Sequence, residues 1–202
     1  MFFFDVTKQH LILTLISIII ISVVLILLYR YKLERFLGRQ MDLVTPEPGD
    51  ILLFFSRKFK DLPDLVFWNG LMTLHTNIPN THYAVVLDDT YYLDSRRPGK
   101  SMYDNITKGE IIGYPRLAKL KHIDEDWVGG DIMVIKTGQS VDSKKREEIL
   151  REFNREGYWK GGGCLGNTNK IQKMIDPMCP LFLSVEGILR HYEDARIGRL
   201  KV

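Results

Sequence analysis

The hydrophobic pattern divides the chain into two unlike parts. Residues 11–29 are predominantly apolar and contain no charge, proline or glycine. At about 1.5 Å per residue this segment spans roughly 29 Å, which matches the hydrocarbon core of a bilayer. Farther on, short apolar runs alternate with polar and turn-forming stretches, as in a globular domain. The pattern predicts an N-terminal tail (1–10), a transmembrane helix (11–29), a basic juxtamembrane linker (30–46) and one domain (47–202).

A cleaved signal peptide is the alternative explanation of the apolar segment. Signal peptides usually have a shorter apolar stretch, with cations before it and a small-residue cleavage site after it. Here the cations follow the segment, at Arg30, Lys32, Arg35 and Arg39. We therefore expect a retained anchor that makes the chain a single-pass membrane protein.

The same four cations predict the orientation of the domain. Loops on the cytosolic side of a membrane carry an excess of Lys and Arg, so we expect the domain on that side. The sequence Asn105-Ile106-Thr107 is a glycosylation sequon, which would matter only for a lumenal domain.

Period-two and short apolar runs predict the strands of the domain. The run 51–55 follows the turn-forming Pro48-Gly49 and is typical of a buried strand. The runs 82–87 and 91–94 are separated by a short polar turn and predict a hairpin, and 131–136 predicts a further strand. We expect a small antiparallel sheet.

Helical spacing predicts three helices around this sheet. An interrupted helix is expected over 61–74, and another begins after a cap at Ser140 or Asp142 and ends near Gly157. The last helix has the most regular apolar face, over 181–192. Its predicted first residue is Pro180, which would place Cys179 at the N-cap. Strands clustered in the middle with helices outside them make the domain α+β.

Composition excludes several classes of function. The 28 Lys and Arg residues and 25 Asp and Glu residues are interspersed and give a net charge of only +3. Without a basic tract, we expect no nucleic-acid partner.

The histidines and cysteines lack the spacing of metal ligands. The glycine-rich segment 161–166 is expected to be a loop, and it lacks the lysine of a phosphate loop. We expect neither a metal nor a cofactor. The two cysteines, Cys164 and Cys179, leave one disulfide between them open.

Three residues could together carry nucleophilic chemistry. A thiol at a helix N-terminus favours its thiolate form, so Cys179 is a candidate nucleophile, although a free cysteine is more commonly a small buried hydrophobe. His82 begins the hairpin and is a candidate base, or a solvated strand end. Asp94 would share a sheet face with His82 if the hairpin turn has three residues, and would lie on the opposite face if it has two. A paired carboxylate would orient the imidazole.

These segments together resemble a known family. Pro48-Gly49-Asp50 before a strand, Thr81-His82 opening a second strand with Asp94 on the next, and a cysteine before a helix are similar to the circularly permuted papain-like superfamily. That superfamily includes NlpC-type proteins, YiiX-type proteins and lecithin:retinol acyltransferase. The resemblance covers roughly residues 46–195. It implies a permuted papain-like domain and thiol hydrolase or acyltransferase chemistry on amide or ester bonds, with Cys179 as nucleophile, His82 as base and Asp94 as orienter.

The pattern departs from the family after the cysteine. Family cysteines are usually followed by small polar residues and then a polar group such as Glu, but Pro180 and Leu181 follow Cys179. An alternative register places Ser184-Val185-Glu186 in this position, with serine in the nucleophile slot and a site that is then inactive.

Three functions follow as hypotheses, the third of which is a passive lipid-binding module. The first is a membrane-anchored thiol hydrolase or acyltransferase acting on a lipid, lipidated or peptide substrate near the bilayer. The second is a catalytically inactive scaffold with the same fold, which holds protein partners of an assembly to a membrane. Because relatives occur in bacteria and in large DNA viruses, the resemblance also makes a virion membrane a candidate location.

Overall fold

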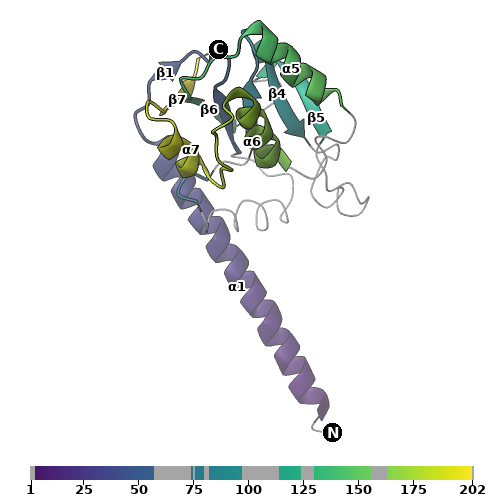
Figure 1. Ribbon diagram of the computed structural model, residues 1–202. Helices are drawn as coiled ribbons and strands as arrows, with labels where there is room; N and C mark the ends of the chain where they lie inside the picture. The colour runs from purple at the N-terminus through teal and green to yellow at the C-terminus, as the bar shows by residue number, and fades with distance from the viewer. Residues whose placement is uncertain are drawn as a thin grey trace.

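The protein is a mixed α+β structure with one long N-terminal helix and a seven-stranded sheet (Figure 1). The computed structural model describes residues 3–56, 74, 76–79, 82–96, 114–123, 130–155 and 163–201. Of the predicted helix 61–74 only residue 74 lies within these residues, and the sequon at Asn105 lies outside them. Along the chain the elements are α1 (Phe3–Leu37), β1 (Leu43–Val44), β2 (Ile51–Ser56), β3 (His82–Val86), β4 (Tyr91–Arg96), β5 (Tyr114–Lys119), η2 (Leu120–His122), β6 (Gly130–Lys136), α5 (Ser143–Phe153), α6 (Gly163–Ile175), α7 (Val185–His191) and β7 (Arg196–Leu200).

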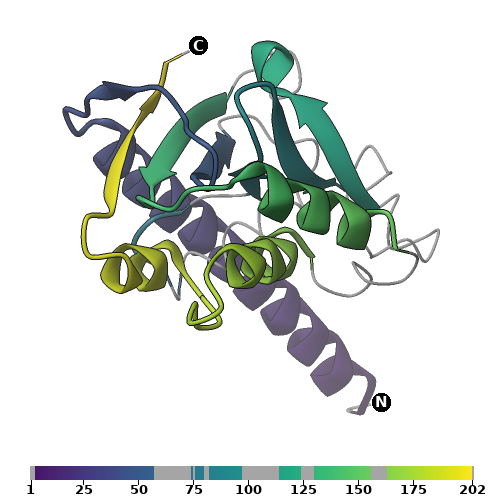
Figure 2. The same ribbon diagram turned by 45° about the horizontal axis from the view of Figure 1, so that its top comes forward.

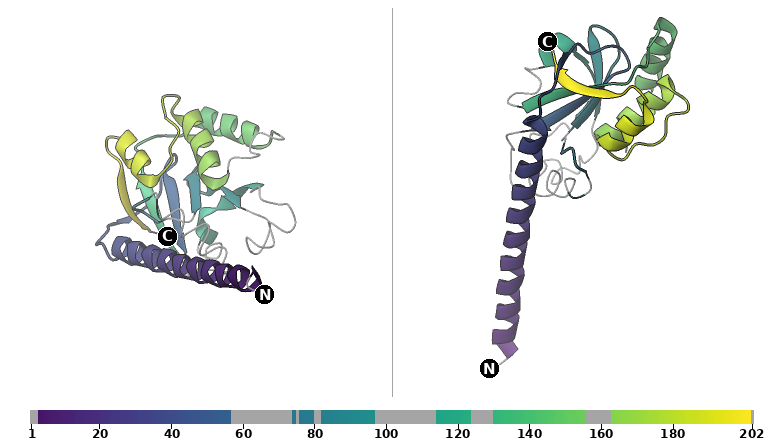
Figure 3. Two further views of the ribbon diagram at one scale, coloured as in Figure 1. Left: turned by 90° about the horizontal axis from the view of Figure 1, so that it is seen from below. Right: turned by 90° about the vertical axis from the view of Figure 1, so that its left-hand side faces the viewer.

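Helix α1 contains the predicted apolar segment and continues into the predicted linker as far as Leu37. Most of it projects away from the domain, and its apolar side chains between Leu11 and Val24 are largely exposed (Figures 1 and 3). Its last turns are different, because Tyr29, Leu33 and Phe36 are buried in the domain core. In the described part of the chain, α1 is the one helix long and apolar enough to cross a membrane.

The sheet has the order β1-β7-β6-β2-β3-β4-β5, and all neighbours are antiparallel except β1 and β7. It is larger than the predicted small antiparallel sheet, since β1, β5 and β7 were not expected. The edge strand β5 contains Pro115, which an edge position tolerates. In β7, Gly198 allows a close approach of β1: a Cβ atom there would lie 2.7 Å from Cγ1 of Val44.

Both faces of the central strands are buried. Helices α5, α6 and α7 cover one face (Figure 3, right), and the end of α1 packs in the same cluster as α7. Alternate residues of β2 divide between the faces: Ile51, Leu53 and Phe55 face the helices, whereas Leu52 and Phe54 belong to the core on the other side. Such continuous burial explains why β2 is an unbroken apolar run rather than an alternating one.

The turn Pro48-Gly49-Asp50 connects the start of β2 to the end of β6. Gly49 has φ +98°, a conformation that glycine adopts without strain. The buried carboxylate of Asp50 accepts the N–H groups of Glu47 at 2.7 Å and Thr137 at 3.1 Å, and it pairs with Lys136 at 2.7 Å. This turn therefore has a structural role.

The helices agree in part with the prediction. Helix α5 begins after Asp142, whose Oδ1 accepts the N–H of Lys145 at 2.7 Å, as the capping pattern predicted. The expected loop at 161–166 was wrong, because α6 begins at Gly163. The glycines before α6 and the weak helix formers Asn167, Thr168 and Asn169 within it hid this helix.

The start of the last helix was also predicted wrongly. Helix α7 begins at Val185 rather than at Pro180, so Cys179 is not an N-cap. The reason lies in α6: the side chain of Asn169 donates to Phe182 O at 2.8 Å and accepts from Phe182 N at 3.0 Å. These two hydrogen bonds hold the backbone of Phe182 outside any helix, and the helix starts only after Ser184.

Candidate active site

The hairpin of β3 and β4 brings His82 and Asp94 together. Ala84 is the cross-strand partner of Asp94, so His82 lies one diagonal step away on the same face. Nε2 of His82 contacts Oδ1 of Asp94 in a short hydrogen bond or ion pair. Both residues are buried, and the side chain of Asp94 is fully shielded from solvent. This arrangement fixes the orientation of the imidazole.

The second oxygen of Asp94 has its own partner. Nη2 of Arg116, on the neighbouring strand β5, donates to Oδ2 of Asp94 at 3.2 Å and to the hydroxyl of Tyr92 at 3.3 Å. The register explains this contact, since Asp94 is directly opposite Arg116. A guanidinium next to a buried carboxylate favours its ionised form, so Arg116 maintains the charge that His82 faces.

The thiol beside His82 is that of Cys164, not that of Cys179. Cys164 is the second residue of α6, which packs on β3 and β4, and His82 is the first residue of β3. The imidazole of His82 and the backbone N–H of Tyr83 lie close enough to the Cys164 sulfur to lower its pKa, and the sulfur in turn raises the pKa of His82. Nε2 of His82 is bound to Asp94, so Nδ1 is the ring nitrogen available to other groups.

The electrostatics of this trio favour a charged pair. Burial opposes the charged form of both groups. Even so, the imidazole of His82 and the N–H of Tyr83 hold the pKa of Cys164 below its usual value. The Asp94 carboxylate and the Cys164 sulfur raise the pKa of His82 above its usual value. A lowered thiol pKa and a raised imidazole pKa together stabilise a thiolate–imidazolium pair.

Cys179 lies in a different environment. It is 1% exposed and belongs to the core cluster that includes Phe182 and Val185. Its sulfur is 3.7 Å from the hydroxyl of Tyr192, which also donates to Oε1 of Gln172 at 2.8 Å. Burial, together with the Asp176 carboxylate, raises the pKa of Cys179. The two cysteines are free thiols, so the disulfide left open by the sequence is not formed.

Ser184, the alternative nucleophile, is the N-cap of α7. Its hydroxyl accepts the N–H of Gly187 at 3.3 Å. A capping hydroxyl is occupied by the helix backbone. Glu186, the acidic residue of that register, accepts the N–H groups of Asn77 and Ile78 at 2.7 and 3.1 Å. Both residues therefore hold backbone segments together.

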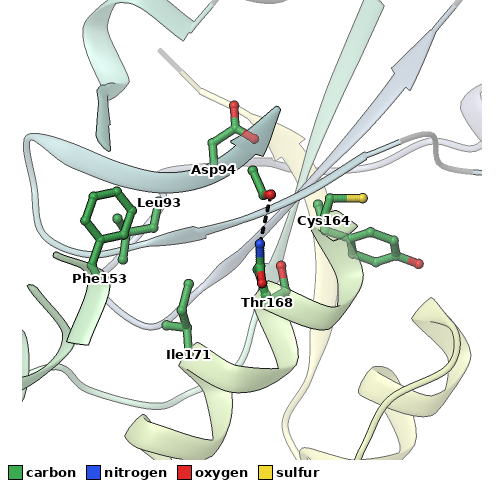
Figure 4. A pocket seen from close by; sticks show the side chains of 9 residues that line it. Leu93, Asp94, Phe153, Cys164, Thr168 and Ile171 are labelled. Atoms are coloured by element: carbon green, nitrogen blue, oxygen red, sulfur yellow. Dashed lines mark hydrogen bonds between the residues drawn. The ribbon is translucent and has the colours of Figure 1, made fainter. Parts of the chain in front are cut away.

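A small pocket adjoins the Cys164 end of α6 (Figure 4). Leu93, Phe153 and Ile171 make its apolar part. Nδ2 of Asn167 crosses the pocket to Oγ of Ser95 at 2.8 Å, and this bond ties α6 to β4. Figure 4 shows Asp94 on the far side of β4 from α6 and the sulfur of Cys164 directed away from the Asn167–Ser95 pair.

Cys164 was missed as a site residue because its helix was missed. A usable signal was present: after Leu165, Cys164 is followed by Gly-Asn-Thr-Asn, the kind of small and polar residues that are absent after Cys179. Within the described part of the chain, no cluster of three or more His, Cys, Asp or Glu side chains could hold a metal ion.

Comparisons with protein-family models, curated proteins and solved structures found no significant match.

Proposed function

We propose that the protein is a membrane-anchored cysteine hydrolase or acyltransferase that acts on ester or amide bonds. The single observation that carries the proposal is the Cys164–His82–Asp94 arrangement at the start of α6. The proposal keeps the base and the orienter expected from the sequence and assigns the nucleophile to Cys164. The order of the elements, with the histidine strand before the cysteine helix, is also that of the permuted papain-like superfamily.

The chemistry follows from the charged pair. The Cys164 thiolate attacks the substrate carbonyl carbon, so a C–S bond forms and the carbonyl electron pair moves to oxygen. The N–H groups of the first turn of α6 lack intrahelical partners and can stabilise that oxyanion. The oxyanion collapses, the bond to the leaving alcohol or amine breaks, and the His82 imidazolium gives the leaving group its proton.

The second half of the reaction returns the enzyme to its starting state. The product of the first half is a thioester on Cys164 and a neutral His82. Water, or an acceptor alcohol or amine, loses its proton to His82 as it attacks the thioester carbonyl. The tetrahedral intermediate expels the thiolate, and the thiolate–imidazolium pair is restored. Water as the attacking group gives hydrolysis, and a second alcohol or amine gives acyl transfer.

The exposed apolar surface of α1 supports the membrane anchor. Side chains such as Leu11, Ile19 and Leu27 are 60 or 61% exposed, and a surface of this length is uncommon on a protein that stays in water. With the domain held at the bilayer, a lipid, a lipidated protein or a membrane-proximal peptide becomes the favoured substrate class. The four cations after the apolar segment support a cytosolic domain.

The test measures which cysteine reacts. The full chain in detergent micelles is treated briefly with iodoacetamide at neutral pH, and the alkylation of each cysteine is followed by peptide mass spectrometry. We expect Cys164 to react on the order of 100-fold faster than Cys179, because Cys164 is the stabilised thiolate and Cys179 is a buried thiol. Equal, slow alkylation of both cysteines would contradict the enzyme proposal and support the inactive scaffold.

A second measurement separates a reactive thiol from an enzyme. Nitrophenyl esters of short and long fatty acids should give a burst of nitrophenol, one equivalent per chain, as the Cys164 thioester accumulates. The variant Cys164→Ala should give no burst, whereas the matched control Cys179→Ala should keep it. A lipid substrate predicts a larger burst rate with the long-chain ester. A chain that alkylates rapidly at Cys164 but shows no burst with any ester would refute the hydrolase proposal.

A further inference from the structure

A second pocket lies where α1 leaves the apolar segment and meets the domain. Its volume is about 370 Å³. Its lining comes from α1 and the turn after it (Tyr31, Lys32, Arg35, Phe36 and Arg39) and from Asn77 of the segment 76–79. None of these residues takes part in the Cys164 site.

Three of the six lining residues are cations on one side of α1. Lys32, Arg35 and Arg39 are spaced three and four residues apart, which places them along one face of the helix and its final turn. The guanidinium of Arg39 lies 5.6 Å from the ring centroid of Phe36. The structure records no ion pair for Arg35 or Arg39 in the described residues. Among the described residues, no Asp or Glu side chain lines the pocket.

The opposite wall of the pocket is held in place by hydrogen bonds. Nζ of Lys32 donates to Thr76 O at 2.9 Å and so connects α1 to the segment 76–79. The N–H groups of Asn77 and Ile78 donate to Oε1 of Glu186, which fixes the same segment to α7. The pocket is therefore a built feature with two anchored walls. An exposed row of lysines and arginines would lack the second wall.

The pocket begins at the depth of the headgroup region of a bilayer and extends beyond it along α1. The apolar segment ends at Tyr29, and Lys32 and Arg35 follow it by roughly 5 and 9 Å along the helix axis. The headgroup region adds about 5–8 Å on each side of the hydrocarbon core. Tyr31 is 62% exposed at this depth, where amphipathic aromatic rings are enriched.

We propose that this pocket binds the phosphate group of an anionic phospholipid in the leaflet that faces the domain. Lys32 and Arg35 supply charge and N–H donors to the phosphate, and the Tyr31 ring and the apolar helix below it contact the glycerol and acyl chains. The inference rests on the membrane span proposed for α1 and is independent of any chemistry at Cys164. Its consequence is a fixed height and rotation of the domain on the membrane.

The experiment uses native mass spectrometry of the full chain released from detergent micelles with added dioleoyl phosphatidic acid or dioleoyl phosphatidylcholine. We expect one phosphatidic acid to be retained per chain in preference to phosphatidylcholine. Each cation removed should weaken this retention roughly fivefold, so the triple variant Lys32→Gln, Arg35→Gln, Arg39→Gln should weaken it on the order of 100-fold. Inorganic phosphate is added in a parallel arm. Displacement of the lipid by phosphate would show that the site takes any phosphate, and this would overturn the lipid assignment.

Two variants separate a pocket from general surface charge. The control Lys121→Gln, Lys144→Gln, Arg151→Gln removes the same charge from exposed positions on η2 and α5, and it should retain the lipid. The variant Asn77→Trp keeps every charge but fills the pocket, and it should lose the lipid. Equal loss in the control, or normal retention with Asn77→Trp, would refute the site. Release of the wild-type chain from vesicles by alkaline carbonate would refute the membrane span itself, which is a distinct failure.

Discussion

The surroundings of the two cysteines differ although the residues are only fifteen positions apart. Cys164 lies in the first turn of α6, and Cys179 lies in the turn that follows the same helix. At the first turn, an imidazole and a backbone N–H meet the sulfur. Beyond the last turn, apolar side chains and the hydroxyl of Tyr192 meet it. The pKa of Cys164 is lowered and that of Cys179 is raised.

The comparison shows that neighbouring groups decide the reactivity of a thiol. Burial disfavours the thiolate at both positions. Only at Cys164 is this cost offset, because His82 supplies a positive charge that Asp94 and Arg116 in turn stabilise. Three strands and one helix must meet to produce that offset. We therefore expect the reactivity of Cys164 to be a property of the folded domain, and experiments that remove the neighbours one at a time should remove the difference between the two thiols.

The largest change is expected when the whole domain is unfolded. In concentrated urea both sulfurs become solvated thiols with ordinary pKa values. The roughly 100-fold ratio of iodoacetamide rates at neutral pH should fall to about 1, and it should return after dilution into micelles. A ratio that survives unfolding would mean that local sequence, and not the fold, sets the reactivity of Cys164.

The next largest effect is expected from His82→Ala. Without the imidazolium, the pKa of Cys164 returns toward or above its usual value, since burial then acts alone. The thiolate fraction at neutral pH falls to a few per cent, so alkylation of Cys164 should slow roughly tenfold and rise steadily with pH. In the wild type the rate should reach its plateau at a lower pH than in the variant, because the pKa of Cys164 is lowered. The rate at Cys179 is the internal control and should not change.

The structural environment of Cys179 is tested by Tyr192→Phe. This change removes the 2.8 Å hydrogen bond to Gln172 and the contact with Cys179. Leaving the buried amide oxygen without its donor should lower the free energy of unfolding by about 1–2 kcal/mol, measured by urea denaturation in micelles. Alkylation of Cys164 and the ester burst should be unchanged. A slower burst would connect Tyr192 to the active site and contradict the division into one reactive and one structural thiol.

Parts of this fold follow directly from sequence patterns. The apolar run 51–55, the hairpin and the cap of α5 at Asp142 were predicted because local spacing and burial agree in each, although α5 ends at Phe153 and not near Gly157. The strand β7 was missed because Arg196 and Arg199 flank a glycine whose role is set by a distant neighbour, Val44. Pairing across that distance leaves no local signal.

The candidate site was also predicted only where its residues are close together in the sequence. His82 and Asp94 lie on adjacent strands of one hairpin, so counting residues placed them on one face, given the turn length. The position of Cys164 depends on packing between α6 and β3. Likewise, the true start of α7 depends on Asn169 binding the backbone of Phe182. The apolar pattern over 181–192 predicted a helix from Pro180, but the helix begins later because tertiary hydrogen bonds outweigh helix propensity.

The smallest effect at neutral pH is expected from Asp94→Asn, because the carboxylate acts on both partners. It stabilises the His82 imidazolium, but its negative charge also raises the pKa of Cys164. Removing it therefore weakens the pair through His82 but removes a charge that disfavours the thiolate, and the ester burst at neutral pH should slow only about threefold.

The clearer change expected from Asp94→Asn lies at alkaline pH. The imidazolium that protonates the leaving group is lost as the pH rises through the pKa of His82, which Asp94 raises. In Asp94→Asn that pKa falls, so the alkaline limb of the pH–rate profile should move down by about one pH unit or more. The variant Asp88→Asn, on the same hairpin but bound to Arg146, is the matched control and should leave the limb in place. An alkaline limb that stays fixed in Asp94→Asn would show that the carboxylate only positions the ring, and the charge argument for the trio would then fail.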